Sequence, residues 1–183
     1  MNRITNEQEK TMLTDIQLLQ IKNRINRILH VPGNYTGGIL EMAIVADYHM
    51  EPEVLREDVR RVAEMLKRQD ETFRNVRLNL IKWVSDDCII KEVVPMPFLL
   101  MGRAFEDIAA ATGKQEPEAA GVNEKTLDEL LRQLKLFYAR SKVILIFTDG
   151  SYHIEDEKAV RSYLQPFLGR KLLVLQKGEQ INI

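Results

Sequence analysis

The sequence predicts an α/β protein with a doubly wound, mainly parallel sheet, one antiparallel edge strand and helices on both faces. Short apolar runs alternate with segments of helical period along the chain, which is typical of parallel strands joined by helices. Two of the runs are separated only by the turn at residues 85–87, which predicts a hairpin and hence one antiparallel strand. A further helix precedes the first strand, so we expect an N-terminal helical extension, residues 1–33, and an α/β domain, residues 34–183.

Five stretches have the composition of strands. Residues 39–46 and 142–147 are short apolar runs, as expected of strands buried on both faces. Residues 75–84 alternate between apolar and polar side chains, which is the period of a strand. The expected strands are 39–46, 75–84, 88–94, 142–147 and 171–176.

Five stretches are expected to be helical. Thr5 and Gln8 have the spacing of a capping box ahead of the first, and Pro52 suits the first turn of the second. In the fourth, apolar residues recur on one side, with Phe137 expected at the end of the buried stripe. The expected helices are 6–29, 52–66, 103–112, 124–139 and 156–168, with an exposed loop over 113–123.

Composition excludes several classes of protein. The 183 residues carry 26 Lys and Arg against 27 Asp and Glu, a balance that argues against a general nucleic-acid binder. The single cysteine, Cys88, excludes an internal disulfide and a cysteine-based zinc cluster. No apolar run approaches the roughly 20 residues of a membrane span, and the polar N-terminus has no signal-peptide core. We therefore expect a soluble cytoplasmic protein that binds neither nucleic acid nor membrane.

Two expected strands end at an acidic residue. Asp47 follows the run 39–46, and Asp149 follows the run 142–147. In doubly wound sheets, ligands bind at the carboxyl ends of the strands, where the strand order reverses. If these strands are neighbours, the two carboxylates lie at one edge and repel each other. A divalent cation, a basic side chain or a proton must then relieve the repulsion.

Residues 37–176 resemble a von Willebrand factor type A domain. The run VILIFTDG at 143–150 matches a strand that ends in Thr-Asp-Gly in that family, and the hairpin from residue 75 matches its second and third strands. The resemblance implies a metal-ion-dependent adhesion site, in which the first strand ends in Asp-x-Ser-x-Ser and a later loop supplies a Thr. Here Asp47 stands in the first position, His49 and Glu51 replace the two serines, and residues 101–104 lack the Thr. The resemblance therefore implies a divergent member with an incomplete site.

Three outcomes are open for the edge at which this site would lie. The carboxylates of Asp47, Glu51 and Asp149 could hold Mg²⁺ together with water molecules, because this cation takes oxygen ligands. With His49 and His153 added, a transition metal such as Zn²⁺ or Mn²⁺ is favoured. In the third outcome no metal binds, and Arg103 or another cation compensates the aspartates directly. The candidate metal ligands are Asp47, His49, Glu51 and Asp149.

A proline-containing apolar run, VVPMPFLLM at residues 93–101, follows the third expected strand. Its large side chains either fold back into the core or form a contact surface for a protein partner, since exposed apolar patches mark binding sites. The residues expected to contact such a partner are Met96, Phe98, Leu99, Arg103 and His153.

The most favoured function is that of a non-catalytic protein-interaction module. Domains similar to this one serve as adaptors for ATPase machines or as scaffolds, and the sequence has neither a Gly-x-Ser-x-Gly elbow nor a phosphate-binding P-loop. A structural homologue that uses its N-terminal helix for assembly is a related possibility. The alternative is a metal-dependent hydrolase or nuclease in which a bound ion activates water. Its site would consist of Asp47, His49, Glu51, Asp149 and His153.

Overall fold

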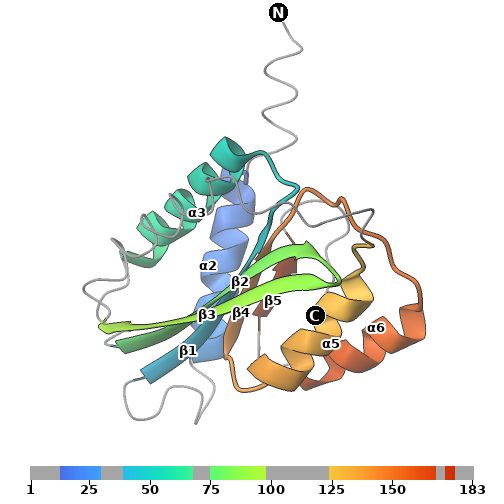
Figure 1. The fold of residues 1–183 in the computed structure, drawn as a ribbon. Helices are drawn as coiled ribbons and strands as arrows, with labels where there is room; N and C mark the ends of the chain where they lie inside the picture. The colour runs from blue at the N-terminus through green and yellow to red at the C-terminus, as the bar shows by residue number, and fades with distance from the viewer. Residues whose placement is uncertain (1–12, 30–38, 68–74, 98–123, 168–171, 176–183) are drawn as a thin grey trace, which may run out of the picture.

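A computed structural model describes residues 13–29, 39–67, 75–97, 124–167 and 172–175, and these form an α/β fold on one mixed sheet (Figure 1). The five strands have the order β3-β2-β1-β4-β5. Only the β2–β3 pair is antiparallel, and the other three pairs are parallel. The strands are β1 Ile39–Asp47, β2 Asn75–Ser85, β3 Cys88–Pro97, β4 Val143–Phe147 and β5 Leu172–Leu175. The predicted α/β class and its single antiparallel strand are confirmed.

The position of each strand explains its composition. All five residues of β4 are buried, and so are residues 42–47 of β1. A central parallel strand is covered on both faces, so it needs a continuous apolar run rather than an alternating one. β3 lies at the sheet edge and includes Pro95 and Pro97. A proline that gives no backbone N–H to the sheet is tolerated at such an edge, so β3 runs three residues past its predicted end.

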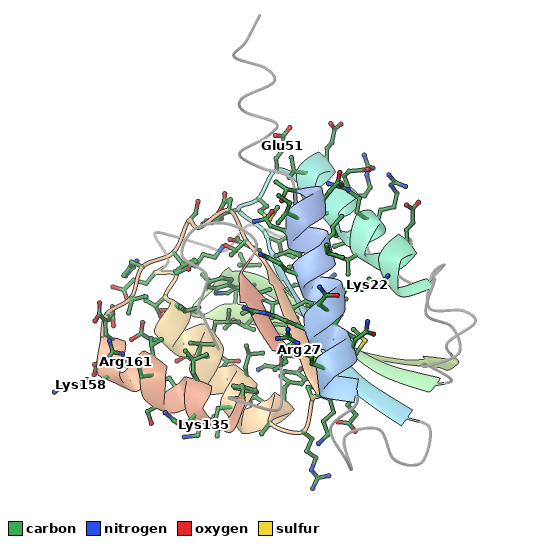
Figure 2. The ribbon with its side chains drawn as sticks, turned by 180° about the vertical axis from the view of Figure 1, so that it is seen from behind. Lys22, Arg27, Glu51, Lys135, Lys158 and Arg161 are labelled. Carbon is green, nitrogen blue, oxygen red and sulfur yellow. The ribbon has the colours of Figure 1, made fainter. Side chains whose placement is uncertain are left out.

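Helices lie on both sides of the sheet, with α5 and α6 on one face and α2 and α3 on the other (Figures 1 and 2). Ala43, Val45 and Ile146 belong to the apolar cluster formed with α5 and α6. The alternate residues Met42 and Ile44 are also fully buried, and strand geometry directs them to the opposite face. The helices are α2 Asp15–Leu29, α3 Pro52–Lys67, α5 Leu127–Tyr138 and α6 Glu157–Leu164, and the 3₁₀ turn η1 Gln165–Phe167 follows α6. Within the described residues, no helix has the length and apolarity that a membrane crossing requires.

Helix α2 begins at Asp15, and residues 1–12 lie outside the described part of the chain. Leu13 and Thr14 are not helical, so a single helix over residues 6–29 is wrong, while Thr5 and Gln8 lie outside the described residues. Thr14 caps α2 instead, because its Oγ1 accepts a hydrogen bond from the Gln17 amide at 3.1 Å and its own amide donates to Gln17 Oε1 at 2.9 Å. This reciprocal pair is a capping box, which satisfies two amides that the helix leaves free.

The buried stripe of α5 also differs from the prediction at one position. The side chain of Phe137 is 61% exposed, whereas Tyr138 is buried. Tyr138 follows the buried Leu134 by four residues, which keeps it on the same helix face, and Phe137 is rotated away from that face. The predicted helix at 103–112 and the loop at 113–123 lie outside the described residues.

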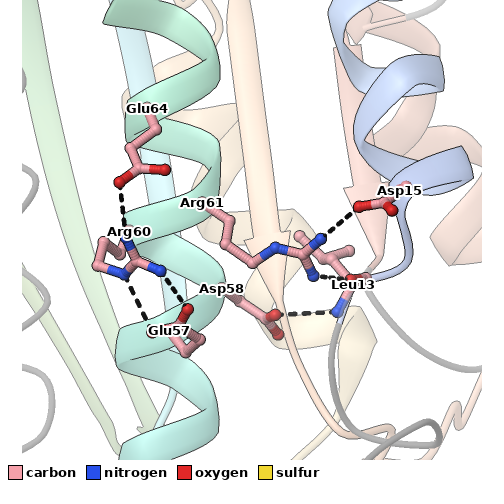
Figure 3. Close-up of polar contacts among 7 residues, drawn as sticks. All are labelled: Leu13, Asp15, Glu57, Asp58, Arg60, Arg61 and Glu64. Carbon is pink, nitrogen blue, oxygen red and sulfur yellow. Dashed lines mark hydrogen bonds and ion pairs between the residues drawn. The ribbon is translucent and has the colours of Figure 1, made fainter.

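The start of α2 is fixed to α3 by polar contacts (Figure 3). The amide of Leu13 donates to Asp58 Oδ1 at 2.9 Å, and the guanidinium of Arg61 donates to the Leu13 carbonyl and to Asp15 Oδ1, the latter at 2.7 Å. Asp58 is fully buried. Burial raises the pKa of Asp58 to about 7, against the opposing effects of the Leu13 amide and the Arg61 charge. The helix therefore packs on the sheet-bearing domain, while the expected division at residue 33 lies outside the described residues.

This pKa predicts a pH-dependent stability. Between the ordinary pKa of 3.8 and about 7, folded Asp58 holds a proton that the unfolded chain releases, so the free energy of unfolding falls as pH rises. The slope from one such group has an upper limit of about 1.4 kcal/mol per pH unit. In Asp58→Asn this loss should be absent, which urea denaturation at roughly pH 5, 6 and 8 measures. The exposed Asp15→Asn is the control, and an unchanged slope in Asp58→Asn contradicts the assignment.

Candidate functional site

Asp47 and Asp149 lie at the same edge of the sheet. β1 and β4 are adjacent and parallel, with Ala46 opposite Phe147, so the residues that follow both strands emerge side by side. β1 pairs with β2 on one side and β4 on the other, which makes this the point at which the strand order reverses. The prediction that Asp47 and Asp149 end neighbouring strands is confirmed. Such a point is where α/β sheets usually bind ligands.

The carboxylate of Asp47 is fully buried and accepts hydrogen bonds from three donors. The ammonium of Lys125 and the His49 amide, at 2.8 Å, donate to Oδ1. The hydroxyl of Thr148 donates to Oδ2 at 2.5 Å. A buried carboxylate is stable only when it is paired and hydrogen-bonded. Both oxygens of Asp47 meet that requirement with groups of the chain itself.

Lys125 is the cation that compensates this edge. Its side chain is 4% exposed, and its Nζ lies 4.6 Å from the centroid of the Trp83 ring, close enough for a cation–π contact. Burial lowers the pKa of Lys125, while the charges of Asp47 and Asp149 and the hydrogen bond to Asp47 oppose that shift. Trp83 in turn contacts Tyr152, with ring centroids 5.6 Å apart. The ammonium therefore sits between a carboxylate and an aromatic face.

The backbone around Lys125 is held from two sides. Asp86, in the β2–β3 turn, donates its amide to the Glu124 carbonyl at 2.8 Å and accepts from the Thr126 amide at 2.8 Å. On the other side, the His153 amide donates to the Lys125 carbonyl at 3.2 Å, and the Leu127 amide donates to the His153 carbonyl at 3.0 Å. The hairpin turn and the loop after β4 thus fix the place from which Lys125 reaches Asp47.

Thr126 joins this clamp to the start of α5. Its hydroxyl contacts both carboxylate oxygens of Asp86, at 3.1 and 3.0 Å, and it accepts from the Glu129 amide at 3.2 Å as the N-cap. Thr126 pairs with His153 in the loop after β4, so the N-terminus of α5 lies at the carboxyl edge of the sheet. The position of Lys125 therefore follows from where α5 begins.

Asp149 is partly buried and lies beside this ion pair. Its Oδ1 accepts from the Ser151 amide at 2.9 Å. Burial alone raises the pKa of Asp149, but the hydrogen bonds from Ser151 and the charges of Lys125 and His49 outweigh it, and the net pKa is lowered. Gly150 has φ of 87°, a conformation that favours glycine, and this turns the chain directly after Asp149.

The remaining candidate metal ligands are not gathered around Asp47. The side chains of His49, Glu51 and His153 are exposed, and His49 contributes its backbone amide rather than its imidazole. His153 Nε2 lies 3.9 Å from Glu155 Oε1, and both side chains are more than half exposed. Among the residues that the structure describes, no three His, Cys, Asp or Glu side chains are placed to hold one metal ion.

The expected partner contacts are only partly described. The backbone of Met96 lies in β3 opposite Val76, and His153 is exposed at the carboxyl edge, where its backbone pairs with Thr126. Phe98, Leu99 and Arg103 lie outside the described residues, so their expected roles stay predictions.

The sequence contained a signal for Lys125 that our prediction did not use. Thr126 and Glu129 have the spacing of a capping box, which indicates a helix start after Thr126 rather than at residue 124. That reading leaves Lys125 in the preceding loop, at the edge to which Asp47 and Asp149 belong. Trp83, Asp86 and Tyr152 carried no comparable signal, because their contacts depend on how distant loops meet.

The chain was compared with known proteins. No protein-family model matches it, and no curated protein matches it. Its functional interpretation therefore rests on the fold and on the geometry of this edge.

Removing the Lys125 charge should destabilise the fold strongly. Lys125→Met keeps much of the apolar stem but leaves Asp47 buried without a counter-charge, which typically costs about 3–5 kcal/mol. Denaturant titration at neutral pH measures the loss. In Lys125→Met/Asp47→Asn the uncompensated charge is gone, so the double variant should be less destabilised than the sum of the single variants.

An exposed ion pair provides the matched control. Arg60 contacts Glu64 at 2.6 Å on the surface of α3, and Arg60→Ala should reduce stability by no more than about 1 kcal/mol. A similarly small effect of Lys125→Met, or strict additivity in the double variant, is incompatible with a structural ion pair at the edge.

Proposed function

We propose that the chain is a non-catalytic protein-interaction module with the doubly wound architecture of a von Willebrand factor type A domain. In this proposal the Lys125 ammonium takes the place that the family gives to a divalent cation. The observation that carries the proposal is the contact between Lys125 and the fully buried Asp47.

The architecture supports the proposal at the level of topology. The strand order β3-β2-β1-β4-β5, with its antiparallel strand at one edge, is the first part of the order known from doubly wound sheets. Asp47 and Thr148-Asp149 occupy the ends of the two strands at the reversal point, as the resemblance requires. The resemblance also implies a later loop that reaches this edge, and the segment ahead of α5 is in a position to serve as that loop.

The chemistry of the edge favours a lysine over a metal. Mg²⁺ requires octahedral coordination by oxygen atoms and retains several waters. Both oxygens of Asp47 are already engaged by Lys125, His49 and Thr148. The side chains of His49 and Glu51, which replace the two serines of the family pattern, are exposed. A protonated lysine supplies the compensating charge without any further ligand.

An interaction role follows more directly from this edge than a catalytic one. Metal-assisted hydrolysis needs an ion with an open position for water, whereas Asp47 is buried beneath Lys125 and Thr148. A charge-compensated edge is a stable platform whose exposed loops, including His49, Glu51, Ser151 and His153, are available for contact. We therefore propose an adaptor or scaffold role in a protein assembly, with an ATPase machine as one candidate partner.

Thermal stability with and without divalent cations tests the role of Lys125. The melting temperature of the wild type should be the same in a chelator and in Mg²⁺ or Mn²⁺, since linkage stabilises only a protein that binds the ion. Lys125→Ala should melt at a lower temperature and recover part of that loss when the cation is added. Without the lysine, the carboxylates of Asp47 and Asp149 need another counter-charge, which the cation can supply. Lys158→Ala, on the surface of α6, is the control. A cation-dependent rise in the wild type that disappears in Asp47→Asn contradicts the proposal.

Affinity capture from extracts of the source cells tests the interaction role. The wild type should retain a defined partner in chelator, and Glu51→Lys should lose it while keeping the melting temperature, because this side chain is exposed at the edge. Lys22→Glu, on the outer side of α2, should retain it. Metal-dependent turnover of a phosphoester by the wild type, lost in Asp47→Asn, instead supports the hydrolase.

A further inference from the structure

Two large apolar side chains are exposed next to each other on α5. Leu136 is 62% exposed and Phe137 is 61% exposed. The buried stripe of the helix, which ends at Leu134 and Tyr138, already anchors α5 to the sheet, so these two side chains are not needed for that packing. Adjacent exposed apolar side chains of this size are typical of contact surfaces.

Cations surround this apolar pair. Arg132 lies one helical turn before Leu136 on α5, and the exposed Arg140 lies in the turn that follows the helix, four residues after Leu136 in the chain. Lys91, from β3, places its Nζ 4.2 Å from the centroid of the Phe137 ring. Lys135 places its Nζ 5.8 Å from the Tyr163 ring of α6. Lys91 therefore contacts Phe137 directly, Arg132 and Lys135 lie on the same helix as the apolar pair, and Arg140 follows the pair in the chain.

Few carboxylates neutralise these cations. Glu129 binds Arg132 through two hydrogen bonds of 2.8 and 2.6 Å. Asp128 is turned toward the start of α6, where its carboxylate accepts from the Glu155 and Asp156 amides. Within the described part of the chain, Lys91, Lys135 and Arg140 have no carboxylate at ion-pair distance. The surface therefore carries a local positive charge, although the whole chain has a formal net charge of −1.

The aromatic contacts prearrange part of this surface. A lysine held over an aromatic ring loses less conformational freedom on binding than a free one, so less of the interaction energy is spent on ordering. Lys91 over Phe137 and Lys135 over Tyr163 are two such lysines. Neither lysine forms an ion pair with a described carboxylate, although the charge of Lys91 is close enough to interact with that of Glu129.

The exposed apolar pair on α2 lacks this environment. Ile16 and Leu19 are 71% and 56% exposed, but the charged neighbour at that end of the helix is Asp15, which already binds Arg61. Lys22 follows Leu19 by three residues, but among the described residues no cation of α2 is held over an aromatic ring, so the α2 pair serves as the comparison for α5.

From this charge complementarity we propose that α5 docks an acidic amphipathic helix of the partner protein. Apolar side chains of the incoming helix would cover Leu136 and Phe137, and its flanking carboxylates would pair with Lys91, Lys135 and Arg140. A helix that presents apolar anchors at i, i+3 and i+4 between acidic residues has this pattern. The inference rests on the proposed function, since it assigns a contact surface and a partner chemistry to the same interaction module. The docking surface consists of Lys91, Arg132, Lys135, Leu136, Phe137 and Arg140.

Fluorescence anisotropy with a designed peptide tests the proposal. The probe is a labelled helical peptide of about 18 residues with leucines along one face and glutamates beside them, and the full chain is titrated into it. Saturable binding is expected, and it should weaken as salt is raised because exposed charges are screened. Lys135→Glu/Arg140→Glu should weaken binding at least about tenfold through like-charge repulsion. Leu136→Ser/Phe137→Ser should also weaken it about tenfold through loss of the apolar anchors.

Matched variants on α2 control for general effects of charge and apolar surface. Lys22→Glu/Arg27→Glu and Ile16→Ser/Leu19→Ser change exposed side chains of the same kinds, and both should bind the peptide as the wild type does. All variants should keep the wild-type melting temperature, since the altered side chains are exposed.

Several outcomes overturn the proposal. These are no saturable binding, equal binding of a scrambled peptide with the same composition, or equal losses in the α2 variants. Stronger binding of anionic vesicles or of a DNA duplex than of the peptide also overturns it, because a membrane or nucleic acid then explains the charge. The cation experiment on Lys125 is independent of this titration. If the peptide does not bind and the melting temperature of the wild type is independent of divalent cations, only the proposed α5 docking surface is contradicted. If the melting temperature of the wild type depends on divalent cations, the proposed role of Lys125 at the edge is contradicted.

Discussion

The fold depends on the buried ion pair between Lys125 and Asp47. Neither charge is tolerable alone in this position, because the desolvation of a single buried ion far exceeds what the surrounding packing returns. The pair therefore requires the end of β1 and the segment ahead of α5 to meet. The remaining contacts of the edge follow from that requirement. Thr148 and the His49 amide satisfy the other acceptor sites of Asp47, and Trp83 covers the ammonium.

The contact between Lys125 and Asp47 brings together parts of the chain that are distant in sequence. Asp86 holds the segment from the β2–β3 turn, and His153 holds it from the loop after β4. Two loops are thus fixed to the segment that carries Lys125. Burial opposes the charge of Lys125, so the carboxylates of Asp47 and Asp149 must keep the side chain protonated. At this edge the buried charges of Lys125 and Asp47 therefore compensate each other inside the chain.

Local patterns predicted the sheet well and the site only in part. The apolar run of β4 and the spacing of the hairpin identify strands and one antiparallel pair without tertiary information. The adjacency of β1 and β4, on which the meeting of Asp47 and Asp149 depends, was only a condition at that point, and the structure meets it. Lys125 was missed because nothing local indicates that a lysine is buried, although the capping pattern at Thr126 placed it at this edge. Phe137 was assigned to the core because positions three and four residues after Leu134 are both compatible with a buried stripe. Only the packing against the sheet selects Tyr138.

The closed edge and the open surface of α5 complement each other. An adhesion site with a metal ion recognises its partner through an unsatisfied coordination position, and a lysine buried under a carboxylate has no such position. In the proposed module, the contacts available to a partner are therefore the exposed loops of the edge and the surface of α5. At the surface of α5, by contrast, Lys91 and Lys135 contact aromatic rings and no described carboxylate pairs with them. The apolar side chains of Leu136 and Phe137 are exposed on the same helix. Under this proposal, recognition on α5 depends on the charge and apolar pattern of the incoming segment.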